Sequence, residues 1–295
     1  MSESTDSPTM IHRPGAVASA MPHHLAGGAC HRFVAPHYDD IPLSCGGTAA
    51  RVTQAGLRAD VTVAFGAEPD PAMPLSPFAE RLHAHWGLPP GRIVASRRAE
   101  EAAAAALLGN SFDVLSFPDA IYRNGHYSSG SALFGEPVIA EADVPDKLAA
   151  ALGMNDPAQT ATHLYIPLAI GGHVDHRLAF AAGVKLALAG RAVHFYEDVP
   201  YALRPGATEA RVAAIQATGL DLRPVATIDV TNTWNLKVLA IMAYVSQLAG
   251  LFGPHGGQGD TRAGIEEELH AYALRAGNGI LGERFWSLDH GITPG

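Results

Sequence analysis

The sequence predicts an α/β fold in which a mainly parallel sheet is covered by helices on both faces. Strand-like and helix-like segments alternate along the first two-thirds of the chain, and this β-α-β-α order is typical of parallel sheets. The 295 residues are 47% hydrophobic, enough for the core of one large domain. The chain shows no internal repeat and no sharp change in composition. We therefore expect a single domain over residues 29–295, preceded by a flexible polar tail over residues 1–28.

The elements of the first two-thirds are identified from local composition. Short apolar or β-branched runs predict strands at residues 32–35, 60–65, 112–117, 163–168 and 192–196. Segments rich in alanine and leucine predict helices at residues 47–55, 77–86, 97–108, 145–152 and 174–189. Gly109 stops the most alanine-rich helix, and the prolines of residues 67–75 predict a loop.

The last third differs in character, because a long apolar helix dominates it. This helix is expected over residues 234–251, between a strand at 226–230 and a flexible glycine-rich loop at 254–260. A further helix at 263–275 and a short final strand at 284–288 complete the chain. Four polar residues of the region are expected on the outer face of the long helix, namely Lys237, Tyr244, Ser246 and Gln247.

Charge and hydropathy exclude several classes of protein. The formal net charge is −9 without a long Lys/Arg cluster, which argues against nucleic-acid binding. No apolar run reaches the roughly 20 residues of a membrane span. The first residues lack the basic and apolar regions of a signal peptide, and Cys30 and Cys45 are too few for a disulfide framework. We therefore expect a cytoplasmic protein with a small-molecule partner, and the composition leaves its oligomeric state open.

A histidine and two carboxylates follow the first predicted strand. The apolar run ends at Ala35, and His37, Asp39 and Asp40 come directly after it. Three protein ligands around an open position hold catalytic zinc, and a nearby carboxylate can take a proton from the water at that position. The alternative is a simple turn, in which Asp39 or Asp40 caps the next helix.

A second cluster follows the predicted strand 163–168. Its histidines, His173 and His176, are three residues apart and therefore share a helix face. The alternative is a solvated first turn of a helix. In an open α/β sheet, ligands bind outside the carboxyl ends of the strands. Because both clusters follow strands, we expect them to meet there.

Together the two clusters resemble the motifs of the PIG-L/LmbE-type N-acetylglucosaminyl deacetylase family. The matching segments are Pro36-His37-Tyr38-Asp39-Asp40, Cys45-Gly46-Gly47 and Gly172-His173-Val174-Asp175-His176. The resemblance covers residues 30–200 well and the rest loosely. It implies a Rossmann-like fold and hydrolysis of N-acetyl amides with one Zn²⁺ per chain, although another divalent metal remains an option.

The resemblance also implies roles for particular residues. His37, Asp40 and His176 would be the metal ligands, and Asp39 would be the general base. His173 would stabilise the oxyanion or protonate the leaving amine. We expect an ionised Asp39 and a protonated His173 to give a bell-shaped dependence of rate on pH.

Substrate-binding residues are predicted from weaker signals. Arg97 and Glu100 are similar to the family's Arg-x-x-Glu at a helix start near the substrate. Asp119 and Arg123 flank the end of a predicted strand, where a bound substrate would lie.

Two departures from the family pattern concern tyrosines. Tyr38 stands where most members have proline, and its role is open. Some members carry a tyrosine just before the second cluster, where this chain has Gly171. Tyr196 and Tyr201 are the candidates to replace it, and the alternative for both is an ordinary strand end and turn.

We therefore predict a zinc-dependent hydrolase that removes the acetyl group from an N-acetylamino sugar or glycoconjugate, releasing acetate and a free amine. One alternative is a zinc N-acyl amide hydrolase that acts on a non-sugar specialised metabolite. Another is a non-catalytic sugar- or nucleotide-binding α/β module. Binding alone needs neither a set of metal ligands nor the adjacent Asp39, so this last class is disfavoured.

Overall fold

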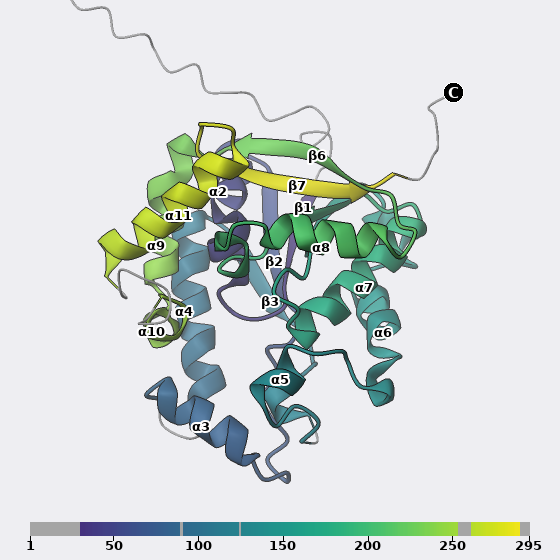
Figure 1. Ribbon diagram of the computed structural model, residues 1–295, viewed down its shortest axis with the longest axis vertical. Coiled ribbons are helices and arrows are strands. Elements are labelled where there is room, and N and C mark those ends of the chain that lie inside the picture. Colours follow the sequence, from purple (N-terminus) through teal and green to yellow (C-terminus); the bar gives the residue numbers. More distant parts are fainter. Residues whose placement is uncertain (1–29, 89–90, 124, 253–260, 290–295) are drawn as a thin grey trace, which may run out of the picture.

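A computed structural model describes residues 30–88, 91–123, 125–252 and 261–289 (Figure 1). The tail expected at 1–28 and the loop expected at 254–260 lie outside the described residues. Within the described part, a seven-stranded sheet runs through the molecule in the order β3-β2-β1-β4-β5-β7-β6. The strands are β1 (Cys30–Ala35), β2 (Arg58–Val63), β3 (Ser111–Val114), β4 (Thr162–Pro167), β5 (Val193–Tyr196), β6 (Leu222–Asp229) and β7 (Gly282–Leu288).

The sheet is parallel from β3 to β5 and antiparallel at β7, which lies between β5 and β6. The carboxyl ends of the five parallel strands therefore meet at one edge, as the sequence predicts. The predicted α/β class with a mainly parallel sheet is confirmed. The antiparallel insertion of β7 has no signal in the sequence.

Helices cover both faces of the sheet (Figure 1). One layer contains α2 (Asp40–Gln54), α4 (Ile93–Leu108), α9 (Trp234–Met242) and α11 (Arg262–Ala276), which pack on one another. On the other face α6 (Val144–Ala151) packs on α7 (Val174–Leu188). Shorter helices are α3 (Pro77–His85), α5 (Gly130–Leu133) and α10 (Val245–Phe252). Helix α8 (Ala207–Gln216), which packs on β6, is absent from the sequence-based assignment.

Helix α2 begins at Asp40, seven residues before the predicted start at residue 47. Its first turns are interrupted at Cys45, whose φ of −142° and ψ of 27° are not helical. The interruption frees two amides of the second half, and a carboxylate from β7 binds them. Glu283 accepts hydrogen bonds from the amides of Gly47 at 3.0 Å and Thr48 at 2.7 Å. Cys45 itself is fully buried and free.

The helix predicted over residues 234–251 is divided into α9 and α10, which meet at an angle of 102°. The carboxylate of Glu100 binds the start of α10, because it accepts from the Ser246 amide at 2.8 Å and hydroxyl at 2.7 Å. Polar side chains on both sides of the bend face inward. Lys237, Tyr244 and Gln247 are all buried, so their predicted place on an outer face is wrong.

No single helix in the described part of the chain is both long enough and apolar enough to cross a membrane. The bent pair of α9 and α10 meets that test together, on length and composition alone.

Candidate metal centre

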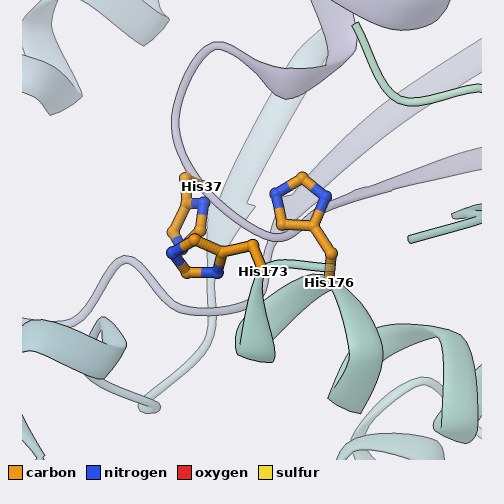
Figure 2. A group of neighbouring side chains, drawn as sticks. All are labelled: His37, His173 and His176. Atoms are coloured by element: carbon orange, nitrogen blue, oxygen red, sulfur yellow. The ribbon is translucent and has the colours of Figure 1, made fainter. Parts of the chain in front are cut away.

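The two clusters meet at the carboxyl edge of the sheet because β1 and β4 are direct neighbours. His37 follows β1, while His173 and His176 lie at the start of α7 after β4. Figure 2 shows the three rings gathered around one point. The ring centroids are 4.7 Å apart for His37 and His173, and 5.4 Å apart for His37 and His176. The three buried side chains can place their nitrogens within 4.8 Å of one another, as around a metal ion.

Asp40 lies between the rings of His37 and His176. Its Oδ2 is 3.7 Å from His37 Nδ1, and its Oδ1 is 3.5 Å from His176 Nε2. Zinc bonds of about 2.0–2.2 Å at tetrahedral angles place neighbouring ligand atoms roughly 3.4 Å apart. Each separation is close to that value, but the two involve different oxygens of Asp40, and the set of single donor atoms that all lie within 4.8 Å of one another here is that of His37, His173 and His176.

A buried carboxylate binds the outer nitrogen of each of these two rings. His37 Nε2 is 2.9 Å from Asp175 Oδ2, and His176 Nδ1 is 2.7 Å from Asp198 Oδ1. An imidazole that donates a proton to a carboxylate on one side presents a lone pair on the other. Both lone pairs then point toward Asp40, which is the arrangement that supports metal-bound histidine.

The charges of the pocket favour a cation. Burial lowers the pKa of His37, but Asp119, Asp175 and Asp40 outweigh it and raise that pKa to about 9. His176 behaves in the same way, because Asp40 and Asp198 raise its pKa against burial. The surrounding carboxylates thus stabilise positive charge on the histidines, and a metal ion can supply that charge in place of protons.

Asp175 in turn forms an ion pair with Arg123. Burial raises the pKa of Asp175, but the guanidinium and His37 lower it well below its usual range. Arg123 Nη1 is 2.6 Å from Asp175 Oδ1, and its Nε is 2.7 Å from Glu141. Arg123 is committed to these carboxylates and is absent from the pocket lining, so the structure does not support its predicted contact with substrate.

Asp39 adopts a strained backbone conformation beside the candidate metal site. Its φ is 99°, which is uncommon for a residue other than glycine. It stands at the N-cap position of α2, yet its side chain makes no capping hydrogen bond, which excludes the simple capping interpretation. Burial raises its pKa to about 7, while Arg97, 3.3 Å away, opposes that rise. A carboxylate with a pKa near neutrality is suited to accept and return a proton.

His173 differs from the other two histidines, because no carboxylate of the described residues hydrogen-bonds to its ring. Its Nδ1 accepts the backbone N–H of Asp175 at 3.2 Å, so the proton of the neutral ring is on Nε2. Burial, together with the nearby His37, lowers the pKa of His173 well below its usual value. This arrangement favours a neutral His173, whereas the sequence led us to expect a protonated one.

Comparison with known proteins agrees with this chemistry. The family model PIG-L, described as GlcNAc-PI de-N-acetylase, matches residues 32–187. The chain belongs to the PIG-L family. This confirms the resemblance, and as a PIG-L member the protein is a metal-dependent N-deacetylase.

Individual PIG-L relatives match nearly the whole chain. A 2'-N-acetylparomamine deacetylase of Niallia circulans is 31% identical over 283 residues, covering 89% of this chain and 95% of the relative. An enzyme of the same name from Streptomyces fradiae is 32% identical, and the match covers 73% of this chain and 72% of that enzyme. The structure of a zinc-inhibited teicoplanin deacetylase superimposes with a TM-score of 0.71 and 26% identity, covering 90% of this chain and 100% of the other.

The candidate active site of this PIG-L protein opens into a cavity of about 420 Å³. Its lining contains the three histidines together with Asp39, Asp40 and Asp119, and the rest of it is mainly apolar. The wall residues include Phe78, Leu82, Trp86, Leu133 and Leu251.

Of the residues predicted to bind substrate, three line this cavity, namely Arg97, Asp119 and Tyr201. Their contact with substrate stays a prediction. Glu100 is not in the lining, because Ser246 binds its carboxylate. Tyr196 is buried in the core, and its hydroxyl donates to the Val34 carbonyl at 2.9 Å. Tyr196 thus cannot replace the missing family tyrosine.

Tyr201 remains beside Gly171 as the other tyrosine candidate. A Cβ at Gly171 would lie 2.4 Å from the Tyr201 ring, so only glycine leaves room for that ring. Tyr38 has a structural role instead. Its hydroxyl donates to the Gly66 carbonyl at 2.8 Å, and its own carbonyl accepts from Arg97 at 2.9 Å.

Sequence reasoning missed two acids of the site. Asp198, which orients His176, follows β5 just as the two clusters follow their strands, and this position was the available signal. Glu101 lies one turn after Arg97 on α4 and accepts from the Tyr244 hydroxyl at 2.7 Å. Burial raises the pKa of Glu101 to about 7. Its spacing of four residues from Arg97 could have indicated a shared face.

Proposed function

We propose that this PIG-L protein is a zinc-dependent N-deacetylase that releases acetate and a free amine from an N-acetylated amino sugar carried in a larger conjugate. The observation that carries the proposal is the pair His37 and His176. Each ring directs one nitrogen toward Asp40 and has the other bound by a buried carboxylate. The names of the relatives support the amino sugar as the substrate class.

In this proposal, His37, Asp40 and His176 would hold one metal ion. Two imidazole nitrogens and a carboxylate oxygen are a donor set that zinc binds in catalytic sites, with a fourth position open. Bound zinc would supply Lewis-acid polarisation and a lowered pKa for water. Another divalent metal stays an alternative, because the related teicoplanin deacetylase has a zinc-inhibited form.

Asp39 would transfer the proton of the attacking water, and His173 would stabilise the negative charge on the carbonyl oxygen. Asp39 accepts a proton from the attacking water and returns it to the nitrogen of the leaving amine when the C–N bond breaks. Neutral His173 donates a hydrogen bond from Nε2 to the carbonyl oxygen as that oxygen gains negative charge. Arg97 holds the Asp39 carboxylate in place, and Tyr201 takes the position beside Gly171.

The apolar cavity wall favours a second candidate. Phe78, Leu82 and Trp86 would also suit a zinc N-acyl hydrolase acting on a non-sugar amide. The non-catalytic binding module is excluded, because membership of the PIG-L family makes the protein an N-deacetylase. The cytoplasmic location and the single-domain organisation over residues 29–295 stay predictions.

A substrate panel with controlled metal content tests the proposal. Metal-free protein would be loaded with Zn²⁺, Co²⁺ or Mg²⁺ and assayed for acetate release. The substrates would be N-acetylglucosamine, 2'-N-acetylparomamine and N-acetylphenethylamine. We expect zinc-dependent release from the sugar amides. Release from the phenethyl amide alone would favour the second candidate, and no release with any metal would contradict the proposed function.

A further inference from the structure

Gln247 on α10 lines the cavity at the candidate metal site, and the proposed reaction gives it no role. We call this space the metal cavity. Leu251, one turn further along α10, lines the metal cavity as well, so this face of the helix forms part of the wall. Gln247 is only 6% exposed. The polar atoms of a buried amide need partners, and the contacts of Gln247 show which of them the protein supplies.

A chain of hydrogen bonds fixes the direction in which the Gln247 amide faces. The hydroxyl of Ser246 donates its proton to the carboxylate of Glu100 on α4, with 2.7 Å between the oxygens. A carboxylate only accepts, so the Ser246 oxygen has no second proton to give. Gln247 Nε2 donates to that oxygen at 2.9 Å. The carbonyl oxygen of the amide, Oε1, is therefore the atom that faces away from Ser246.

Two acids of α4 hold the start of α10 in place around this amide. Glu100 also accepts from the Ser246 backbone amide at 2.8 Å, and Glu101 accepts from the Tyr244 hydroxyl at 2.7 Å. The backbone amide of Gln247 in turn donates to the Tyr244 carbonyl at 2.8 Å. A group held in this way loses little conformational freedom when it binds a ligand, which strengthens and sharpens recognition.

The carbonyl oxygen of Gln247 accepts no hydrogen bond from the described residues. Much of the remaining lining of the metal cavity is apolar, so a ligand in the cavity is the natural source of a donor. A site that offers an acceptor to a substrate hydroxyl disfavours an analogue without that hydroxyl. A neutral carbonyl suits a neutral hydroxyl, whereas a carboxylate such as Asp119 is the stronger partner for an ammonium group.

We propose that Gln247 determines specificity by accepting, through Oε1, a hydrogen bond from a hydroxyl of the sugar ring that carries the N-acetyl group. Glu100 and Ser246 are positioning residues, because they act on the substrate only through the Gln247 amide. The inference rests on the proposed function and deepens it, since it assigns a recognition contact in the same cavity. It also gives a role to Glu100, which is absent from the cavity lining.

Calorimetric binding to the zinc-loaded protein tests this contact without turnover. The probes are glucosamine and its 3-deoxy, 4-deoxy and 6-deoxy analogues, each of which lacks one ring hydroxyl. We expect one analogue to bind about 3- to 10-fold more weakly than glucosamine, as the loss of a single neutral hydrogen bond implies. Equal affinity for all the probes, or no binding of any of them, would overturn the proposal.

A substitution at Gln247 shows whether that residue causes the difference. Gln247→Met keeps the length of the side chain and removes the amide, so it should bind glucosamine and the weakened analogue equally. A difference that survived at full size in Gln247→Met would contradict the proposal. Gln54→Met is the matched control, because it makes the same change at an exposed position outside the cavity lining. An equal loss in this control would also overturn the assignment.

Glu100→Gln tests the positioning role separately. Without the carboxylate, the Ser246 hydroxyl is free to donate to Gln247, and the amide can turn over and present Nε2 to the ligand. The preference for glucosamine over the weakened analogue should therefore shrink, and adding Glu100→Gln to Gln247→Met should change it no further. A loss of affinity by the same factor for every probe would show that Glu100 only stabilises α10, and the positioning role would be wrong.

Turnover separates this inference from the proposed function. If the Gln247-dependent preference is found but no N-acetyl sugar is hydrolysed, the contact stands and the proposed function fails. If N-acetylglucosamine and its deoxy analogues are hydrolysed, and Gln247→Met changes kcat/KM by the same factor for each, the function stands and the inference about Gln247 is wrong.

Discussion

Two groups of buried charges contact helix α2, and they differ in how completely the protein satisfies them. At the interruption of the helix, Glu283 accepts from the Gly47 and Thr48 amides and from Lys237 Nζ at 2.6 Å. At the start of the helix, the Asp40 carboxylate accepts one hydrogen bond, from the backbone amide of His37. Its other neighbours are two imidazole nitrogens, His176 Nε2 at 3.5 Å and His37 Nδ1 at 3.7 Å.

The difference separates a structural charge cluster from a binding site. Around Glu283 both carboxylate oxygens accept from donors within the protein, so we call this cluster closed, and it does not line the cavity at the candidate metal site. Around Asp40 the inward-facing atoms are all potential metal ligands, and they border a cavity. Burial of charge alone thus does not identify a site, whereas an incomplete set of partners beside a cavity does.

The largest expected effect comes from removing a proposed ligand. His176→Ala should lose both the metal and the activity, with turnover falling by at least about 10³-fold. Elemental analysis and acetate release on the same sample would measure both. His126→Ala, at an exposed histidine, is the control and should change neither. Full metal content with full activity in His176→Ala would refute the ligand assignment.

A change at the neighbouring carboxylate should separate metal binding from proton transfer. Asp39→Asn cannot accept the proton, so the protein should keep its metal while kcat falls by about 10²–10⁴-fold. Asp40→Asn should instead lose the metal. If the metal were lost from Asp39→Asn and kept by Asp40→Asn, the roles of the two carboxylates would be reversed.

A substitution in the closed cluster around Glu283 should lower the stability of the protein. Lys237→Met leaves Glu283 as a buried carboxylate without its cation, which should cost about 3–5 kcal/mol of unfolding free energy. Urea unfolding would measure the loss, and folded protein should keep its metal content. Lys147→Met is the matched control, because its ion pair with Asp143 is exposed and should contribute little. Equal stability of Lys237→Met and the wild type would contradict the closed-cluster interpretation.

A smaller effect is expected from the residues that orient the histidines. Asp198→Asn weakens the hold on His176 Nδ1, so metal affinity should fall by about 10–100-fold. Competition with a chelator would measure that affinity. Asp221→Asn, at an exposed aspartate paired with Arg223, should leave it unchanged. An unchanged affinity in Asp198→Asn would show that the ring is oriented by packing alone.

The smallest effect should be a shift in the pH profile. Asp39 must lose its proton to act as a base, so kcat/KM should rise with pH through the pKa of Asp39. Burial raises that pKa to about 7, and a bound cation lowers it, so the acid limb should lie at or below pH 7. Arg97→Gln removes a charge that lowers the pKa, and the limb should move up by about 1 pH unit. If Glu101→Gln abolished the limb instead, Glu101 would be the titrating group.

The amino-acid sequence by itself determined the parallel sheet and the position of the chemistry. The strand-forming runs that precede His37 and His173 are local patterns. The rule that ligands bind at the carboxyl ends of strands depends only on the order of strands and helices. The family motifs are equally local. For this reason the deacetylase class and the groups of the pocket floor could be predicted from the amino-acid sequence alone.

Only the tertiary structure decided which polar residues serve the site and which serve the core. The sequence pattern places Lys237 and Tyr244 on the outer face of a helix. In the structure Lys237 binds Glu283 of β7, and Tyr244, at the bend after α9, binds Glu101 of α4. Arg123 and Tyr196 read as substrate contacts, but partners 52 and 162 residues away bind them. Such pairings join segments far apart in the chain, and the local periodicity of a sequence carries no information about them.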